Sequence, residues 1–371
     1  MVPIPRSTDV FIVGGGPAGI ATAIAARLKG LDVTVVDPAQ PPIDKACGEG
    51  LMPDSLTALE LLGISIGPDQ SYPFRGIRFA HENASVASDF PIRRGLGIRR
   101  IYLHQTMLDR ARQLGVRMVW GRRATGIGPG FASISGEEMS CRWTVGADGL
   151  NSRVRCWAGL ESARYESRRF GFRRHYGVAP WSDHMEIHWG DGYQIYLTPV
   201  GRDHVCVALL TRDPRQRLDD ALQAFPELVR KLDGAVANAQ RGAVTVFRRL
   251  HHVFGGSTVL VGDASGSVDA ITGEGLCLAF RQALALADAF VTGDLRSYQS
   301  AHDRLFWRPA FMARLMLLLD QSPSLRRRTI RALSSNPEIF ANLVAMHVGE
   351  SSFADFLSGA MLPLGWRMWT I

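Results

Sequence analysis

One glycine-rich segment constrains the fold of this chain more than any other feature. Residues 14–19 read GGGPAG, which matches the pattern G-x-G-x-x-G. They stand between a short apolar stretch at 9–13 and an Ala-rich stretch at 20–29. A β-branched stretch at 31–36 follows and stops at Asp37. This order predicts a strand, a tight turn, a helix and a second strand, the unit that binds dinucleotides.

Four residues of this unit have separate physical roles. Gly14 permits the tight turn, and Gly19 allows the helix to pack closely on the strand. Gly16 lets backbone N–H groups approach a pyrophosphate because it has no Cβ, and the helix N-terminus adds unpaired N–H groups. Asp37 lies close to the spacing of about 20 residues expected of an acid that accepts hydrogen bonds from a ribose diol.

Two later segments also place polar residues where a buried strand ends. Asp148 belongs to the run VGADGLNSRVR at 145–155, and Asp263 belongs to LVGDASG at 260–266. Ligands gather at the carboxyl ends of strands in an open α/β sheet, and a carboxylate there can bind sugar or ribityl hydroxyls. Gly273 and Gly275 precede a long apolar helix, so they suit an anion or a polar ring edge at its N-terminus.

The pattern of apolar and polar residues changes between these segments. From about 165 to 250, short alternating or β-branched runs are separated by turn residues, which predicts a meander of antiparallel strands. We therefore expect an α/β protein with a discontinuous Rossmann-like domain, an inserted antiparallel β-sheet domain and a helical C-terminal extension. The expected bounds are 1–71, 99–165 and 251–300 for the first, 72–98 and 166–250 for the second, and 301–371 for the extension.

The three motifs in this order resemble the FAD-binding fold of the para-hydroxybenzoate hydroxylase superfamily. The resemblance implies that the first motif and its acid hold the ADP half of FAD. It implies that the DG motif lies near the pyrophosphate and the passing nicotinamide cofactor, and that the GD aspartate contacts the ribityl chain. The run RIYL at 100–103 matches the family's R-x-x-L, with Arg99 as the alternative to Arg100. The FAD contacts so implied are Gly14, Gly16, Gly19, Asp37, Arg100, Asp148, Asp263, Gly273 and Gly275.

A finer resemblance is to the geranylgeranyl reductase-like branch. The run KACGEGL at 45–51 resembles its K-x-C-G-x-G-L loop, and 262–275 resembles its GDAAG…TGEG pattern. The halogenase W-x-W-x-I-P signature is absent from the sequence. The resemblance implies an FAD-dependent oxidoreductase that acts on a lipophilic small molecule such as a polyketide, an aromatic or an isoprenoid. We favour a monooxygenase; the alternatives are a reductase of isoprenoid C=C bonds and a non-enzymatic prenyl-binding protein.

Cys47 is the one residue to which we assign a catalytic role from sequence. It stands in a Gly-rich loop near the nucleotide motif with Lys45 close by, and a nearby cation favours the thiolate. The alternative is a small residue that fills a tight loop. The histidines show no metal-ligand spacing, so we expect no metal site and name no general base. No second G-x-G-x-x-G opens a helix, which leaves transient NAD(P)H or a separate reductase as the electron donor.

Composition limits the partners and the compartment. The net charge is +7, but no block of five or six like charges marks a nucleic-acid-binding arm. The five Cys lack a C-x-x-C pair, and no signal sequence or long uncharged apolar run is present, which predicts a cytoplasmic protein. The stretch 353–371 has an interfacial composition that suits contact with a membrane or a greasy substrate, but we favour packing on the core of the same chain, because such stripes usually belong to the core. Its apolar side chains are Leu362, Leu364, Trp366, Met368 and Trp369, beside Arg367.

We expect the meander to supply an apolar wall of the substrate pocket. Half of a strand's side chains point away from any one face, so the sequence alone does not decide which aromatic residues face the pocket. The aromatic residues considered for this wall are Phe170, Phe172, Trp189, Tyr193 and Tyr196.

Overall fold

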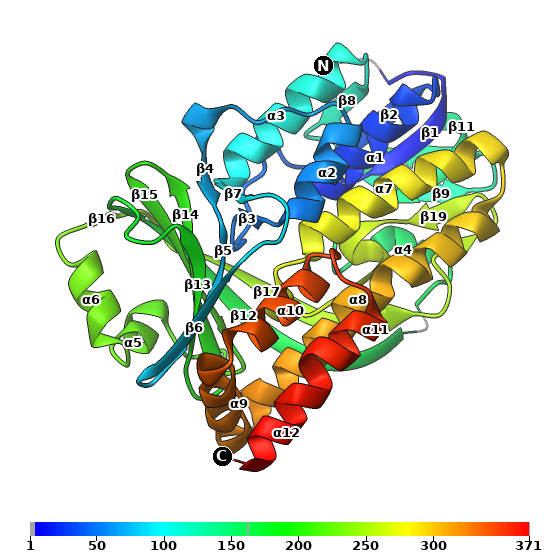
Figure 1. Cartoon of the computed structure of the whole chain (residues 1–371). Coiled ribbons are helices and arrows are strands. Elements are labelled where there is room, and N and C mark those ends of the chain that lie inside the picture. Colours follow the sequence, from blue (N-terminus) through cyan, green and yellow to red (C-terminus); the bar gives the residue numbers. More distant parts are fainter. Residues whose placement is uncertain (1–3, 162, 371) are drawn as a thin grey trace.

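The computed structural model describes residues 4–161 and 163–370 of the chain. Two sheets lie side by side, and helices of the C-terminal part run along their lower side (Figure 1). One sheet is built mainly of parallel strands and the other mainly of antiparallel strands. The predicted fold class, an α/β protein with a Rossmann-like part, a β-sheet part and a helical extension, is confirmed.

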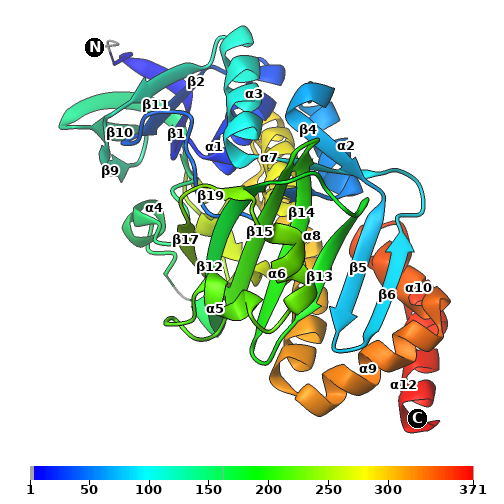
Figure 2. The same cartoon turned by 90° about the vertical axis from the view of Figure 1, so that its left-hand side faces the viewer.

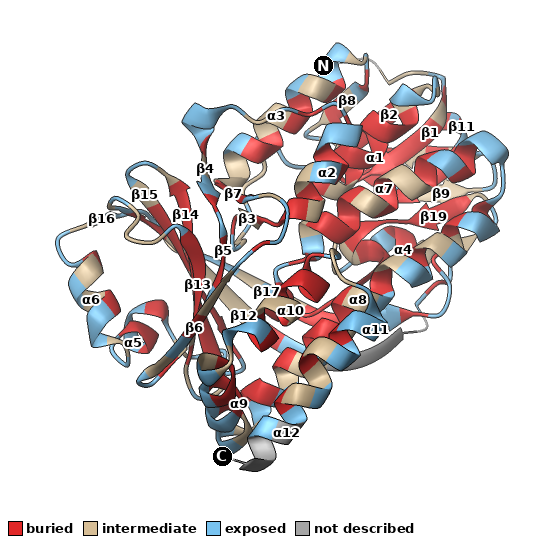
Figure 3. Ribbon diagram, viewed as in Figure 1, coloured by how far each residue is buried: buried red, intermediate tan, exposed pale blue. Residues whose placement is uncertain are grey.

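The first sheet has eight strands in the order β18-β19-β11-β1-β2-β8, extended by the β9–β10 hairpin. Its central strands pair in parallel, with Val10 opposite both Val33 and Trp143. Their β-branched and apolar side chains are almost all buried (Figure 3). The bounds are β1 Ser7–Val13, β2 Val33–Asp37, β8 Arg117–Trp120, β9 Ala124–Gly128, β10 Phe131–Ile134, β11 Glu137–Gly146, β18 Phe254–Gly255 and β19 Thr258–Leu260.

Helices pack on this sheet and on one another. Helix α1 (Pro17–Leu28) contacts α3 (Arg100–Gln113) and α7 (Gly275–Thr292). Among the described helices, only α7 is long and apolar enough to cross a membrane, with a mean hydropathy of 1.3 over an 18-residue window. Of that window, 56% is buried inside the protein, where α7 packs against α1 and α8 (Leu295–Gln321).

The second sheet has nine strands in the order β20-β17-β12-β15-β14-β13-β5-β6, with β16 beside β12. Neighbouring strands are antiparallel except β5 and β13, which are parallel. Side chains point alternately to the two faces, and in the central strands β13, β14 and β15 both faces are largely buried. The bounds are β5 Gly76–His81, β6 Ala84–Asp89, β12 Ala163–Gly177, β13 His184–Trp189, β14 Tyr193–Gly201, β15 His204–Thr211, β16 Val236–Ala237, β17 Arg241–Leu250 and β20 Gly266–Ser267.

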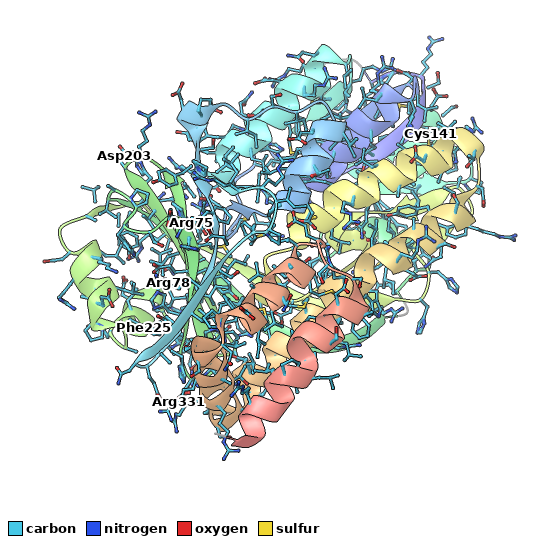
Figure 4. The ribbon with its side chains drawn as sticks, viewed as in Figure 1. Arg75, Arg78, Cys141, Asp203, Phe225 and Arg331 are labelled. Carbon is cyan, nitrogen blue, oxygen red and sulfur yellow. The ribbon has the colours of Figure 1, made fainter. Side chains whose placement is uncertain are left out.

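The outer face of this sheet is covered by α5 (Leu218–Leu222) and α6 (Pro226–Leu232), which lie in front of it in Figure 2. Ile195, Val207 and Leu209 form this outer core. Phe225, labelled in Figure 4, packs edge-on against Tyr193 at a ring distance of 6.3 Å. The inner face is therefore the one left for the first sheet and the C-terminal helices.

The segment 72–98 is divided between two sheets. Strands β5 and β6 join the large sheet, as expected for this segment. Strands β4 (Ser71–Phe74) and β7 (Gly95–Ile98) instead pair with β3 (Gly50–Leu51) in a small three-stranded sheet. Helix α2 (Pro53–Leu61) follows β3 directly. The small sheet thus anchors the C-terminal end of the loop that contains Cys47, and it anchors both ends of the strand pair β5–β6.

The C-terminal helices pack on the inner face of the large sheet. A buried ion pair joins them to it: Arg169 Nη2 lies 3.3 Å from Asp320 Oδ1, and Gln194 Nε2 donates to the same oxygen at 2.6 Å. Leu364 is buried, whereas Leu362 is 66% exposed. The structure does not describe the side chains of Trp366, Met368 and Trp369. The bounds are α9 Pro323–Ser335, α10 Pro337–His347, α11 Phe353–Phe356, η4 Leu357–Met361 and α12 Leu362–Thr370.

Candidate active site

A cavity of about 540 Å³ lies between the carboxyl ends of the first sheet and the inner face of the second. Parallel strands end at a common edge, so motifs that are far apart in sequence meet there. Gly19 does not line the cavity. A Cβ at this position would overlap the carbonyl oxygen of Gly14, so the glycine allows the turn and the helix to pack closely. The other predicted residues line the cavity: Gly14, Gly16, Asp37, Cys47, Arg100, Asp148, Asp263, Gly273 and Gly275.

The glycine turn after β1 is shaped for close approach of a ligand. Gly14 has φ +112°, a conformation that favours glycine, and its missing Cβ would overlap the backbone of Ala147. At Gly16, by contrast, no atom of the described residues other than its chain neighbours lies within 4 Å of the Cβ position. The open space at Gly16 lies at the N-terminus of α1, where unpaired N–H groups favour a phosphate.

Asp37 and His104 hold this turn from two sides. Asp37 Oδ2 accepts a hydrogen bond from Gly15 N at 2.7 Å, and Oδ1 accepts one from Ala39 N at 2.7 Å. His104, on α3, has Nδ1 at 3.0 Å from Ile43 N and Nε2 at 2.7 Å from Gly15 O. Because Ile43 N–H can only donate, Nε2 carries the ring proton and donates to Gly15. Burial lowers the pKa of His104, which keeps the ring neutral. The sequence patterns gave no sign of this histidine.

The two later aspartates have different local partners. Asp148 accepts hydrogen bonds from Ser152 Oγ at 2.5 Å and Arg153 N at 2.7 Å, so it supports the N-terminus of α4 (Arg153–Trp157), whose N-cap residue is Ser152. Asp263, in η2 (Gly262–Ser265), is half-exposed, with Oδ2 at 3.4 Å from Lys45 Nζ. Asp263 lines the cavity, and its remaining acceptor capacity suits the hydroxyl groups of a polyhydroxyl chain.

Arg100 provides a direct test of whether these residues fit a flavin dinucleotide. Its backbone N–H, at the start of α3, donates to Glu49 Oε1 at 2.9 Å. Its side-chain Nε is buried without a hydrogen-bond partner among the described residues. A buried guanidinium nitrogen needs an acceptor, and FAD offers phosphate, ribityl and ring oxygens. Together with the open cradle at Gly16, the site fits FAD; contact of each named residue with the cofactor stays a prediction.

The large sheet forms the opposite wall, as expected, but only part of the aromatic set faces it. Phe172 and Tyr196 line the cavity, together with Ala208, Leu210 and Val246. The other three aromatic residues do not line it, so the structure makes a choice among the five that the sequence had left open. Tyr193 lies in the outer core, Trp189 packs edge-on against Phe79 at 5.6 Å, and Phe170 lies beside Arg168.

A second cavity, of about 180 Å³, continues along the same inner face beneath the C-terminal helices. Met185 lines both cavities, and the residues of η3 (Ala270–Thr272) divide between them. Its lining is almost entirely aliphatic and aromatic, with Thr272, Thr329 and His347 as the polar exceptions. Chain segments from β5, β13, α8, α9, α10 and α12 contribute to it. An apolar chamber thus adjoins the end of the first cavity that lies by Gly273.

A buried polar cluster stands behind this junction. Glu274 follows Gly273, and its carboxylate lies 3.4 Å from Arg308 Nη2 and 3.5 Å from His347 Nδ1. Burial raises the pKa of Glu274 to about 8; the charge of Arg308 opposes this shift, and the charge of Asp54 contributes to it. Burial lowers the pKa of His347 to about 4. Glu274 therefore holds a proton near neutral pH while His347 is uncharged.

A second buried cluster lies behind Cys47. The side-chain donor atoms of Glu49, His175 and Cys206 all lie within 4.8 Å of one another, a grouping that the sequence spacing did not reveal. Although each could ligate a metal, the Arg173 guanidinium lies 3.8 Å from Glu49 and already supplies a positive charge. Burial raises the pKa of the Cys206 thiol, which keeps its proton. The cluster is an ion and hydrogen-bond network as it stands.

The family model described as "FAD binding domain" matches residues 7–293 of the chain. The chain is similar to the menaquinone reductase of Mycobacterium tuberculosis, with 28% identity over 359 residues, 85% of each chain. It is also similar to digeranylgeranylglycerophospholipid reductase 1 of Methanopyrus kandleri. That match has 28% identity over 294 residues, which covers 72% of this chain and 76% of the relative.

Solved structures share the fold at lower identity. A flavoprotein/dehydrogenase from Cytophaga hutchinsonii has a TM-score of 0.83 and 16% identity, covering 98% of both chains. The 2-methyl-3-hydroxypyridine-5-carboxylic acid oxygenase has a TM-score of 0.72 and 23% identity, covering 93% of this chain and 96% of its own. At these identities the likeness describes the fold alone.

Proposed function

The chain belongs to the FAD binding domain family of the para-hydroxybenzoate hydroxylase type and is an FAD-dependent oxidoreductase; on this premise, we propose that it reduces C=C bonds in a lipophilic isoprenoid substrate. The apolar chamber that adjoins the cofactor cavity at Met185 and Gly273 carries this proposal. The relatives that match most of the chain are reductases, and one of their names denotes geranylgeranyl chains. An apolar chamber of this kind suits such a chain better than a compact polar ring.

Reduction of a C=C bond adds a hydride to one carbon and a proton to the other. When bound and reduced, the flavin supplies the hydride. We assign the proton to Cys47 Sγ, which is half-buried in the wall of the cavity and regains its proton from solvent. Tyr196, Leu210 and Val246 form the apolar wall opposite and exclude water from the reacting carbons. NAD(P)H or a separate reductase would supply the electrons.

Monooxygenation is the second candidate, and it was our preference from sequence. The apolar sheet wall would serve it equally well, because oxygen insertion also requires that water be excluded. The two reactions differ in what they consume. A reduction proceeds without O₂ and adds two hydrogen atoms to the substrate, whereas a monooxygenation needs O₂ and adds one oxygen atom.

The deciding experiment incubates the chemically reduced holoenzyme with a geranylgeranyl-bearing lipid, with and without O₂. Mass spectrometry of the product should show added hydrogen in the anaerobic sample. Product that appears only with O₂ and carries oxygen would overturn the proposal in favour of the monooxygenase. Val344→Phe, which narrows the apolar chamber, should slow turnover of long-chain lipids more than that of short-chain analogues while FAD content stays normal.

Cys47 can be tested in the same assay. Cys47→Ala should leave FAD content near that of the wild type and slow product formation, because the proton must then come from water. Cys277→Ala, a buried cysteine on α7 that does not line the cavity, is the matched control. Normal rates in Cys47→Ala would leave this thiol as a loop-packing residue.

A further inference from the structure

The carboxylate of Glu49 is completely buried, yet it belongs to a loop that borders the cofactor cavity. The loop leads from β2 to β3 and contains Lys45 and Cys47. Burial of a carboxylate is unfavourable unless charged or hydrogen-bonding groups compensate it. The groups that compensate it here come from parts of the chain far from Glu49 in sequence.

Two hydrogen-bond donors and one guanidinium group surround this carboxylate. His175 Nε2, on β12, lies 2.6 Å from Oε2, and Arg100 N donates to Oε1 at 2.9 Å. Arg173 Nε, two residues before His175 on the same strand, lies 3.8 Å from Oε1. One side chain thus joins the loop, the start of α3 and the inner face of the large sheet.

The tautomer of His175 follows from its other contacts. Asn238 Oδ1 accepts a hydrogen bond from His175 N at 2.9 Å, which turns the Asn238 amide nitrogen toward His175 Nδ1 at 2.8 Å. Arg173 Nη1 lies 3.1 Å from the same ring nitrogen. Both neighbours are donors, so Nδ1 is the acceptor and Nε2 carries the proton that His175 donates to Glu49. The geometry makes His175 a fixed donor to this carboxylate.

The backbone of Glu49 is in an unfavourable conformation. Its φ is +60°, in the left-handed region that side chains with a Cβ rarely adopt. Such conformations persist where surrounding contacts hold them and are concentrated at functional sites. In this conformation Glu49 N donates to Cys47 Sγ at 3.4 Å. The carbonyls of the same turn are also held, since Thr198 Oγ1 donates to Gly48 O at 2.7 Å and Cys206 Sγ lies 3.8 Å from Cys47 O.

We propose that Glu49 is a positioning residue, whose buried carboxylate, held by His175 and Arg173, keeps the 47–49 turn left-handed and so fixes the Cys47 thiol at the cavity wall. The fixed orientation of the thiol follows from these contacts alone. Its use in turnover rests on the proposed function. Release of the carboxylate frees the turn to leave the left-handed region, and the thiol then samples more exposed positions.

The test measures alkylation of Cys47 by iodoacetamide in the FAD-loaded protein, followed by peptide mass spectrometry. All variants carry Cys156→Ser, because Cys156 is exposed, whereas Cys141, Cys206 and Cys277 are buried. Glu49→Ala should increase the alkylation rate of Cys47 several-fold. Glu49→Gln, which keeps the size of the side chain and removes its charge, should act in the same direction and serves if the Ala variant does not fold.

Two further variants separate the carboxylate from the backbone. Glu49→Gly lacks the carboxylate but adopts φ +60° without strain. If the carboxylate positions the turn, the Gly variant should react as fast as Glu49→Ala; a wild-type rate in Glu49→Gly alone would assign the positioning to the backbone and overturn the proposal. His175→Gln retains a donor toward Glu49 and should react near the wild-type rate, whereas His175→Leu should react several-fold faster.

Glu60→Ala is the matched control, because Glu60 is exposed and pairs with Arg93 away from the cavity. Its alkylation rate should equal that of the wild type. Unchanged Cys47 alkylation in folded Glu49→Ala and Glu49→Gln would overturn the positioning role and leave the proposed reductase untouched. Faster alkylation together with no reduction of the geranylgeranyl lipid by the wild type would keep the positioning role and overturn the reductase.

Discussion

His104 Nε2 donates a hydrogen bond to Gly15 O at 2.7 Å and so supports the glycine turn from a helix that begins 85 residues later in the chain. The same ring accepts a hydrogen bond from Ile43 N. The turn at the start of α1 is therefore held on one side by Asp37 and on the other by His104. This arrangement pre-forms the cradle before any phosphate binds.

We expect His104→Leu to destabilise the protein by about 1–3 kcal/mol, because Gly15 O and Ile43 N–H would lose their partner in a buried position. FAD content should fall as well, since the turn would be less well held. Urea unfolding and flavin absorbance measure the two effects. His104→Gln, which can still donate to Gly15, should lie between the leucine variant and the wild type. Equal stability of all three proteins would contradict this account.

Gly16→Val should abolish FAD retention without unfolding the protein. Apart from its chain neighbours, no atom in the described part of the chain lies within 4 Å of the Cβ position at Gly16, so a side chain there enters the cradle and not the core. Gly19→Val is the contrasting variant, because its Cβ would overlap the carbonyl of Gly14 and disturb the turn itself. Circular dichroism and flavin absorbance separate the two outcomes. A folded Gly16→Val protein with full FAD content would show that the cofactor lies elsewhere.

Asp263→Ala should weaken FAD binding by about 1–3 kcal/mol through loss of a charge-assisted hydrogen bond. The substitution also breaks the contact with Lys45 Nζ at 3.4 Å. Lys45→Met removes that contact while the carboxylate remains, so it measures how much the ion pair alone contributes to FAD binding. Fluorescence titration of the apoprotein with FAD gives both dissociation constants. If Lys45→Met weakens FAD as much as Asp263→Ala does, the effect belongs to the pair and not to Asp263.

Glu274 should make the stability of the protein depend on pH. Its folded pKa of about 8 lies above the ordinary value of 4.5, so between these values the folded state binds the proton more tightly than the unfolded chain. Stability therefore falls as the pH rises through this window. Glu274→Gln removes the titration, and its stability relative to the wild type should increase from about pH 5 to about pH 8.

Urea unfolding of the two proteins across this window measures the difference. Glu338→Gln, an exposed substitution on α10, is the control and should leave the pH dependence unchanged. A constant difference between Glu274→Gln and the wild type at every pH would contradict the raised pKa.

Membrane contact through the C-terminal segment stays a prediction, and the structure sharpens its test. Leu357 is 42% exposed and Leu362 is 66% exposed, whereas Phe356 and Leu364 are buried. Deletion of 353–371 would open the apolar chamber, so point variants are the cleaner test. The double variant Leu357→Ser/Leu362→Ser should co-sediment less with anionic liposomes. Leu61→Ser, equally exposed on α2, is the control. Equal sedimentation of all proteins would favour simple packing on the core.

The parts of the site predicted from sequence are those whose chemistry is local. A strand, a glycine turn and a helix follow one another along the chain, so their backbone geometry could be anticipated at Gly14 and Gly16. Asp37, Asp148 and Asp263 could be placed together because each follows a strand and parallel strands end at one edge. The family resemblance added Arg100, which lines the same cavity and whose buried Nε has no hydrogen-bond partner among the described residues.

The parts that could not be predicted depend on pairs that are distant in sequence. Glu49 and His175 are 126 positions apart, and nothing local to either residue indicates the other. The sequence also did not show which side chains of the large sheet point toward the cavity. A shift of one residue in the register of a strand would turn all of its side chains to the opposite face. Phe172 and Tyr196 line the cavity, whereas Trp189 does not, although all three stand in similar strand patterns.

The order of strands has a consequence for how the protein is made. Strand β19, which completes the parallel part of the first sheet, is synthesised after almost all of the second sheet, whereas β5 and β6 of the second precede β8 and β11 of the first. The strands of the two sheets are thus interleaved along the sequence, so neither sheet is formed from one continuous segment of the chain. Such long-range pairing slows folding and exposes unpaired strand edges on the ribosome. The last strand of the first sheet ends at Leu260 and that of the second at Ser267, so both sheets receive their final strand near the C-terminal end of the matched family region.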